Sequence, residues 1–153
     1  MRVLAVDLGS VRTGLAVSDP LGFSAQPLPT IPGGSPKKMS KALLDLIFSY
    51  AKEADEKRRI GTVLLGHPVL LNGKPSDTSR ASEECARLLR ELLRQKISYP
   101  IDVILRDERL TSVAAERFML EGDASREKRK EKKDQIAAQL ILENYLEQKR
   151  REV

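Results

Sequence analysis

The spacing of hydrophobic residues changes along this chain, and the order of those changes constrains the fold more than any other feature. Three short apolar or extended segments come first, at residues 3–8, 15–17 and 23–31. Short turns separate them, and the third segment ends in the turn-rich sequence PGGSP. Such segments predict strands, and connections this short favour antiparallel neighbours. The first part of the chain is therefore predicted to form three antiparallel strands.

The rest of the chain alternates between helical and extended patterns. Two further apolar runs, at residues 62–65 and 101–105, predict strands. Apolar residues at helical spacing predict helices at 37–57, 81–92, 111–122 and 134–148. Strands joined through helices are usually parallel. The prediction is one α/β domain over residues 1–153, in which helices flank a mixed five-stranded sheet with antiparallel strands first and parallel strands after.

The composition excludes several kinds of site. Cys85 is the only cysteine and His67 the only histidine, so neither a disulfide nor a Cys/His zinc site can form within the chain. A Ser-His-Asp triad would need His67, and the sequence lacks the G-x-S-x-G turn. The first apolar run is too short for a signal peptide or a membrane span, so a cytoplasmic protein without membrane contact is expected. A net charge of +5 suits a polyanionic partner such as nucleic acid.

Three carboxylates stand at the ends of predicted elements, and each has a structural interpretation as well as a functional one. Asp7 closes the first strand, where it could simply be a turn residue. Glu108 follows the last predicted strand, where it could pair on the surface with Arg106 or Arg109. Asp134 begins the last predicted helix in line with its apolar face, where it could be an N-cap or a first-turn acid.

The functional interpretation requires the three carboxylates to meet. Three such groups without counter-charges would repel one another, so a cluster of them is expected to recruit a cation. Oxygen ligands without histidine or cysteine favour Mg²⁺ or Mn²⁺ over zinc. A pair of such ions can activate water and stabilise the leaving oxygen when a phosphodiester bond is hydrolysed. Asp7, Glu108 and Asp134 are therefore predicted to be both metal ligands and catalytic residues.

Four sequence motifs resemble those of the YqgF family, which is bacterial and has an RNase H-like fold. Its members are described both as Holliday junction resolvases and as nucleases that mature the 5′ end of 16S ribosomal RNA. The motifs follow the family's order and span nearly the whole chain: DLGSVRTGLAVSD at 7–19, LGHP and NG at 65–68 and 72–73, DERLTS and AER at 107–112 and 115–117, and KDQIAA at 133–138. The resemblance implies an RNase H-like nuclease domain.

The resemblance also implies roles for single residues. The metal-binding acids of the family fall on the three carboxylates named above. Basic positions of the first and second motifs fall on Arg12 and Arg80, and Arg109 follows the predicted catalytic glutamate. All three are predicted to contact nucleic acid. The family usually has Gly-Pro before the residue that matches Arg80, whereas Thr78 and Ser79 stand there in this chain.

Two glycines and the histidine complete the residues compared with the family. Gly9 and Gly14 would allow the backbone to approach a phosphate closely. His67 stands where small or apolar residues are frequent in the family. It is predicted to be structural or incidental, not a ligand.

A basic segment without apolar periodicity precedes Asp134. Residues 122–133 are predicted to be a mobile loop, of which residues 126–133 hold six basic and two acidic side chains. Such a loop can close over a phosphate backbone and become ordered on binding. Lys128, Arg129 and Lys130 are therefore predicted to bind nucleic acid.

The sequence leaves several functions open. The favoured one is a metal-dependent ribonuclease that processes the 5′ end of precursor 16S ribosomal RNA, acting as a monomer or weak homodimer. A Holliday junction resolvase would use the same chemistry in a symmetric dimer with two active sites. An actin-like or sugar-kinase-type phosphate-binding protein also begins with an Asp-x-Gly hairpin, but it needs two such domains. A non-catalytic nucleic-acid-binding module would tolerate the loss of Asp7.

Overall fold

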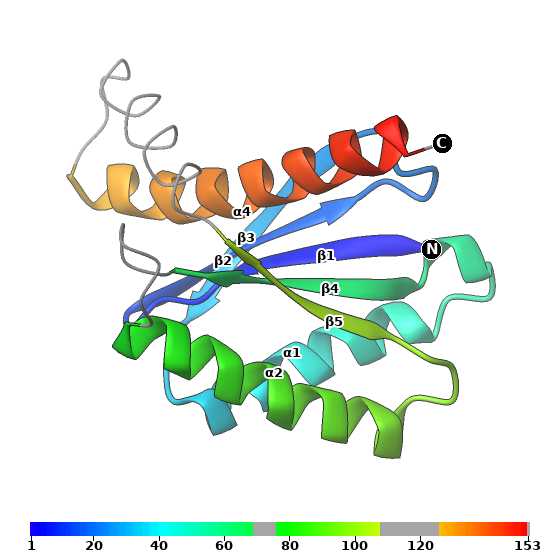
Figure 1. The fold of residues 1–153 in the computed structure, drawn as a ribbon, viewed down its shortest axis with the longest axis horizontal. Helices are drawn as coiled ribbons and strands as arrows, with labels where there is room; N and C mark the ends of the chain where they lie inside the picture. The colour runs from blue at the N-terminus through cyan, green and yellow to red at the C-terminus, as the bar shows by residue number, and fades with distance from the viewer. Residues whose placement is uncertain (69–75, 108–125, 153) are drawn as a thin grey trace.

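Strand β1 (Arg2–Asp7) lies at the centre of a five-stranded sheet with the order β3-β2-β1-β4-β5. On one side β1 pairs antiparallel with β2 (Arg12–Ser18), which pairs antiparallel with β3 (Ala25–Pro32). On the other side β1 pairs parallel with β4 (Ile60–His67), which pairs parallel with β5 (Asp102–Asp107). The predicted mixed sheet, antiparallel first and parallel after, is confirmed (Figure 1).

The structure is a computed structural model that describes residues 1–68, 76–107 and 126–152, with side chains described from residue 132 onward in the last of these ranges. The predicted helix at 111–122 lies outside the described residues. No helix within them is both long and apolar enough to cross a membrane.

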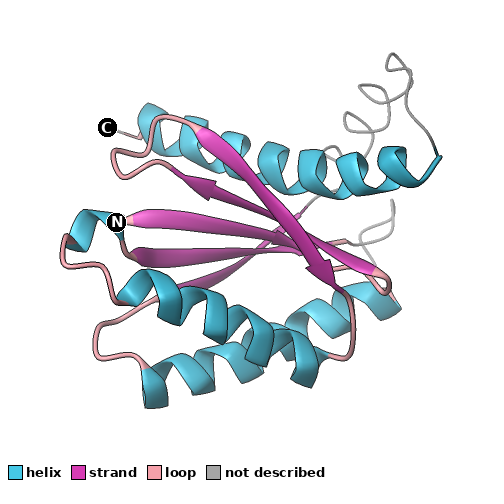
Figure 2. Ribbon diagram, turned by 180° about the vertical axis from the view of Figure 1, so that it is seen from behind, coloured by secondary structure: helices cyan, strands magenta, loops and turns pink. Residues whose placement is uncertain are grey.

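Helices cover both faces of the sheet. Helices α1 (Pro36–Ala51) and α2 (Asp77–Lys96) lie against one face, and α4 (Arg126–Arg151) lies across the other (Figures 1 and 2). Alternation along the strands supplies an apolar surface to each face. In β1, Leu4 and Val6 face α1 and α2, whereas Val3 and Ala5 face α4.

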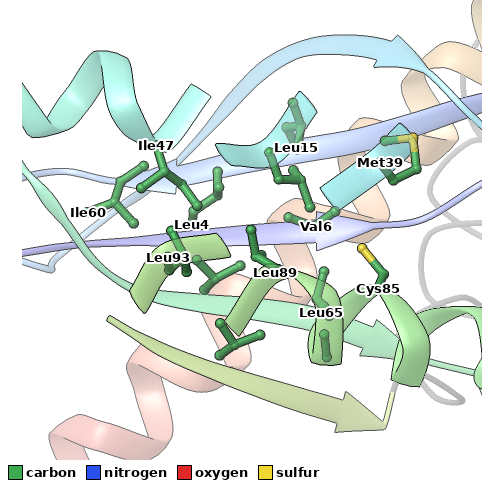
Figure 3. Close-up of a cluster of buried hydrophobic side chains, with 14 of the residues drawn as sticks. Leu4, Val6, Leu15, Met39, Ile47, Ile60, Leu65, Cys85, Leu89 and Leu93 are labelled. Atoms are coloured by element: carbon green, nitrogen blue, oxygen red, sulfur yellow. The ribbon is translucent and has the colours of Figure 1, made fainter. Parts of the chain in front are cut away.

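The larger core fills the space between the sheet and the pair α1 and α2 (Figure 3). Its helical members recur at helical spacing, as the sequence predicted, and they interlock with buried residues of the strands. The fully buried side chains at its centre are Leu4, Leu15, Leu43, Ile47, Leu65 and Leu89. Cys85 is also buried there, and desolvation raises the pKa of its thiol to about 11. The thiol is therefore protonated and unreactive at physiological pH.

Helix α1 is shorter than predicted. It ends at Ala51, whereas the pattern of apolar residues suggested a helix as far as residue 57. Ala54, which seemed to continue the apolar stripe, is exposed. Asp55 instead caps a short 3-10 turn, Glu56–Arg58, by accepting a hydrogen bond from the backbone N–H of Lys57. A local side-chain hydrogen bond of this kind competes with continued α-helix.

Helix α4 is longer than predicted. It begins at Arg126, eight residues earlier than the predicted start at residue 134, so the prediction of a loop is wrong for residues 126–133. Arginine, lysine and glutamate have high helix propensity, which allows a helix to form without an apolar stripe. The buried stripe of α4 follows later and includes Ala138, Leu142 and Leu146, beside the predicted Ala137 and Ile141.

The backbone of α4 touches the sheet at Gly14. A Cβ atom built on Gly14 would lie 2.0 Å from the backbone oxygen of Asp134, a distance that no real contact permits. In this structure the backbone of α4 lies against Gly14, and the predicted close approach of this glycine to a phosphate stays a prediction. Two glutamine side chains fasten the same stretch of helix to the edge strand β3, because Gln135 donates to the Leu28 carbonyl at 3.0 Å and Gln139 to the Ala25 carbonyl at 3.3 Å.

Replacing Gly14 with alanine should destabilise the protein by about 2 kcal/mol, since the added methyl group must push α4 away from β2. Urea unfolding followed by circular dichroism would measure the loss. Gly34→Ala is the matched control, because a Cβ there meets only the flexible side chain of Lys38. Equal stability of the two variants would contradict the close packing of α4 on Gly14.

Candidate functional site

Asp7 is the last residue of the central strand β1, at the carboxyl end shared with β4 and β5. Its partner across the antiparallel pair is Gly14 of β2. Alternation from Val3 and Ala5 places the Asp7 side chain on the face of the sheet covered by α4. Open α/β sheets usually hold their ligand sites at this edge.

Asp134 reaches the same place from α4. Its backbone lies over Gly14, which is the residue paired with Asp7. Because α4 begins at Arg126, Asp134 lies in the third turn of the helix. The interpretation of Asp134 as an N-cap or first-turn acid is therefore excluded. Its side chain is 27% exposed, so it lies on the sheet-facing side of the helix at the rim of the core.

The two carboxylates are close enough to affect each other. The pKa of Asp134 is raised, first because burial disfavours its charged form and second because the charge of Asp7 repels it. Arg12 and Lys133 act in the opposite direction and offset part of this effect. The structure thus brings together two of the three predicted acids, and the net effect of burial and the surrounding charges is a raised pKa of Asp134.

Arg12 is the basic residue placed beside this pair. Its Nε atom lies 3.9 Å from Oδ2 of Asp134, which is an electrostatic pair and too long for a hydrogen bond. Both side chains are less than one-third exposed. They belong to the wall of a pocket of about 250 Å³ that is also lined by Gly9, Ser10, Val11 and Lys133. The pocket therefore combines carboxylate, guanidinium and ammonium groups at the end of β1.

Glycine close contacts and hydrogen bonds fix the conformation of the loop between β1 and β2. A Cβ on Gly9 would lie 2.0 Å from the Arg12 carbonyl oxygen, so the close turn requires glycine. The N–H of Gly9 points to the hydroxyl of buried Thr13, at 3.4 Å. Gly33 supports the loop from outside, since its N–H donates to the Val11 carbonyl at 2.8 Å and its α-carbon lies against the Gly9 backbone. The supporting roles of Thr13 and Gly33 were missed by the sequence analysis, in which Gly33 was only part of a turn signal.

Arg80 lies apart from the carboxylates. It stands in the first turns of α2, its side chain is 71% exposed, and its Nη1 atom is 3.9 Å from Oδ1 of Asp77. Helix α2 nevertheless begins near the β1–β2 loop. This proximity is seen in a pocket of about 410 Å³ that is lined by Asp77 and Thr78 together with Gly9 and Ser10. Within the part of the chain that the structure describes, no contact joins Arg80 to Asp7 or Asp134. A role in nucleic-acid binding remains a prediction.

His67 ends β4 at the same edge of the sheet, next to Asp107 of β5 in the parallel register. Its Nε2 atom lies 2.9 Å from Oε1 of Glu83 on α2. This contact ties the end of the strand to the helix that follows it. The geometry is compatible with the structural role expected for His67.

The remaining predicted residues fall where the structure gives no side chains. Glu108 and Arg109 lie outside the described residues, and so do the side chains of Lys128, Arg129 and Lys130, although their backbone belongs to α4. Within the described residues, no three Asp, Glu, His or Cys side chains gather as a metal site. Glu108 follows Asp107, the last residue of β5, directly in the chain.

Comparison with known proteins extends these observations. The family model described as "RuvX: Holliday junction resolvase" matches residues 1–148. A Bacillus subtilis protein named "Putative pre-16S rRNA nuclease" is 37% identical over 147 residues, which covers 96% of this chain and 98% of that protein. A Streptococcus suis protein of the same name is 39% identical over 148 residues, covering 96% and 98%.

Solved structures agree on the fold at much lower identity. RuvC of T. thermophilus in complex with a Holliday junction substrate has a TM-score of 0.55 at 12% identity, covering 97% of this chain and 96% of RuvC. The fowlpox virus Holliday junction resolvase has a TM-score of 0.53 at 16% identity, and the match covers 97% of this chain and 99% of the resolvase. These similarities confirm the predicted RNase H-like fold. The family match over residues 1–148 and the similar curated proteins confirm the resemblance seen in the motifs. The chain belongs to the RuvX family, which is the family called YqgF in the sequence analysis.

Proposed function

We propose that this protein is a divalent-metal-dependent nuclease in which Asp7, Asp134 and Glu108 hold Mg²⁺ or Mn²⁺ and hydrolyse phosphodiester bonds of nucleic acid. One observation carries the proposal. Asp7 and Asp134 come from distant parts of the chain, yet they meet on one face at the carboxyl end of the sheet, where burial and then repulsion by the charge of Asp7 raise the pKa of Asp134. A cation between them would remove this repulsion.

The donor atoms fit such a cation. Carboxylate oxygens are the ligands preferred by Mg²⁺ and Mn²⁺, and the pocket beside Asp134 contains no cysteine or histidine. Arg106 faces α4, through contacts with Asn144 and Tyr145. Glu108, the third proposed ligand, follows the last residue of β5 directly in the chain and would add a third carboxylate.

The chain's own groups have separate tasks in this proposal. When bound, the metal supplies an activated water and neutralises negative charge on the reacting phosphate. Asp7 and Asp134 orient the site because one ends a central strand and the other is fixed by the contact between α4 and Gly14. Arg12 and Lys133 place positive charge beside the same pocket, where a phosphate group would be attracted. Lys128, Arg129 and Lys130, whose backbone belongs to the first turns of α4, are proposed to bind the nucleic acid as well.

We propose precursor 16S ribosomal RNA, at its 5′ end, as the substrate, because relatives 37% and 39% identical to this chain are named as pre-16S rRNA nucleases. A cytoplasmic location and a monomer or weak homodimer go with this proposal. The second candidate is a four-way DNA junction, and it is favoured by the description of the matching family as Holliday junction resolvases. Both substrates would use the same carboxylates.

The role of Asp7 can be tested by substitution. Asp7→Asn should reduce the cleavage rate by about a thousandfold, since it removes one of the groups that stabilise charge in the transition state. Binding of the substrate should remain, because Asp7 contributes negative charge that repels nucleic acid. Gel-based cleavage assays and fluorescence anisotropy measure the two quantities. Asp45→Asn, on the exposed side of α1, is the control, and cleavage at the normal rate by Asp7→Asn would leave only a non-catalytic binding module.

If Asp134 is destabilising without a metal ion and binds one when it is present, replacing it should raise the stability of the metal-free protein and weaken metal binding. Without divalent metal at pH 7, Asp134→Asn should unfold at a higher temperature than the unsubstituted protein, because the folded state no longer holds the disfavoured charge. The raised pKa means that this penalty grows as pH rises above the ordinary value of 3.8 and is absent well below it, so the difference should vanish in acid.

Adding Mg²⁺ should raise the unfolding temperature of the unsubstituted protein more than that of Asp134→Asn. Differential scanning calorimetry with and without Mg²⁺ measures both effects, again with Asp45→Asn as the control. If Asp134→Asn were less stable than the unsubstituted protein at pH 7 without metal, the charged form of Asp134 would stabilise the metal-free fold. There would then be no charge repulsion for a cation to remove.

The choice between the two substrates requires a direct comparison. A precursor 16S ribosomal RNA fragment with its 5′ extension should be cleaved with kcat/KM at least about tenfold higher than a synthetic four-way DNA junction, a difference of roughly 1.4 kcal/mol in transition-state stabilisation. Asp7→Asn prepared in parallel controls for contaminating nucleases. Cleavage of the junction alone would reverse the assignment.

A further inference from the structure

Arg106 is a basic residue of β5 that is held by neutral groups of α4. Its Nη2 atom donates a hydrogen bond of 2.8 Å to Oδ1 of Asn144. Its guanidinium carbon lies 5.4 Å from the centre of the Tyr145 ring, within the range of a cation–π contact. Figure 1 shows β5 crossing the sheet toward α4. The guanidinium is thus oriented without losing its charge.

A second cation approaches the same ring. The Nζ atom of Lys149 lies 5.6 Å from the centre of Tyr145 and 3.6 Å from Oε2 of Glu152. Arg106, in contrast, forms no ion pair with any carboxylate among the described residues. Of the two cations at this ring, only Lys149 has a carboxylate partner among the described residues, so an anion bound at Arg106 would supply the counter-charge that Arg106 lacks there.

The register of the sheet places Arg106 on the face that carries Asp7. Gly66 of β4 is opposite Arg106, and Leu65 of β4 is opposite Val6. One residue further along, Asp7 therefore stands beside Gly66. Two strand spacings separate Asp7 from Arg106, which is roughly 10 Å between backbones. Glycine at the intervening position leaves no side chain between them.

We propose that Arg106, oriented by Asn144 and Tyr145, binds a backbone phosphate of the nucleic acid next to the cleaved segment. The inference rests on the proposed nuclease function. Asn144 lies ten residues beyond Asp134 in α4, roughly 15 Å along the helix, so the phosphate at Arg106 is not the reacting one. Arg106 therefore contributes to substrate binding and to the path of the strand across the face of the sheet, and it takes no part in the chemical step.

The test is the salt dependence of RNA binding. Affinity for a fluorescein-labelled precursor 16S ribosomal RNA fragment is measured by anisotropy at several salt concentrations, with Asp7→Asn as the parent so that cleavage does not interfere. Arg106→Gln should weaken binding about tenfold and lower the slope of log Kd against log salt by about one, as expected when one phosphate contact is lost. Arg106→Lys keeps the charge, so it should retain the slope with an intermediate affinity. Asn144→Leu should weaken binding without changing the slope, because it removes only the orientation of Arg106.

Arg87→Gln is the matched control. Arg87 lies on α2, over the opposite face of the sheet, and it is paired with Glu84 at 2.6 Å. Its loss should change neither affinity nor slope. With Asp7 intact, Arg106→Gln should raise KM about tenfold and leave kcat within about twofold.

The outcomes separate the two proposals. Lack of cleavage by the unsubstituted protein would overturn the nuclease function. If the unsubstituted protein cleaves, but the slope of log Kd against log salt is the same for Arg106→Gln and Arg87→Gln, the proposed role of Arg106 is overturned and the nuclease function stands. Circular dichroism of each variant verifies the fold, and Arg106→Lys provides the answer should Arg106→Gln be unstable.

Discussion

The contact between the backbone of α4 and Gly14 of β2 is the constraint on which the site depends. Gly14 is paired with Asp7 in the sheet, and the carbonyl oxygen of Asp134 occupies the space where a side chain at position 14 would be. One close approach of helix to strand therefore fixes the distance between two carboxylates from opposite ends of the chain. The apolar stripe of α4 and the hydrogen bonds of Gln135 and Gln139 hold the helix in that position.

The same constraint creates an electrostatic cost. Asp134 is partly buried next to Asp7, and its pKa is raised first by this burial and second by the charge of Asp7, although Arg12 and Lys133 act in the opposite direction. A site optimised only for folding would place a neutral residue there. The arrangement is understandable if the two carboxylates are meant to share a cation, in which case stability is given up for function.

Much of the fold could be predicted from the sequence because its signals are local. The apolar run of β1 and the helical stripes of α1 and α2 depend on neighbouring residues, and their alternation specifies a mixed sheet. The two wrong boundaries have local causes of another kind. At Asp55 a side-chain cap ended a helix that the apolar pattern would have continued, and before Asp134 helix propensity extended a helix that shows no apolar pattern.

The site was predictable only in part. The sequence placed Asp7 at a strand end and Asp134 on the sheet-facing side of a helix, and the structure agrees with both positions. It could not reveal that Gly14 receives the backbone of α4, because that contact joins residues far apart in the chain. Arg106 was considered only as a surface partner of Glu108, since its contacts with Asn144 and Tyr145 depend on how β5 crosses α4.

Whether Asp7 and Asp134 share a cation can be seen in a crystal structure of the protein grown with Mn²⁺, with anomalous diffraction data collected to locate the ion. We predict an anomalous peak within bonding distance of carboxylate oxygens from both Asp7 and Asp134, with Asp134 released from Arg12. A map with no peak between these two residues, or with Mn²⁺ bound only elsewhere, would rule out a shared cation.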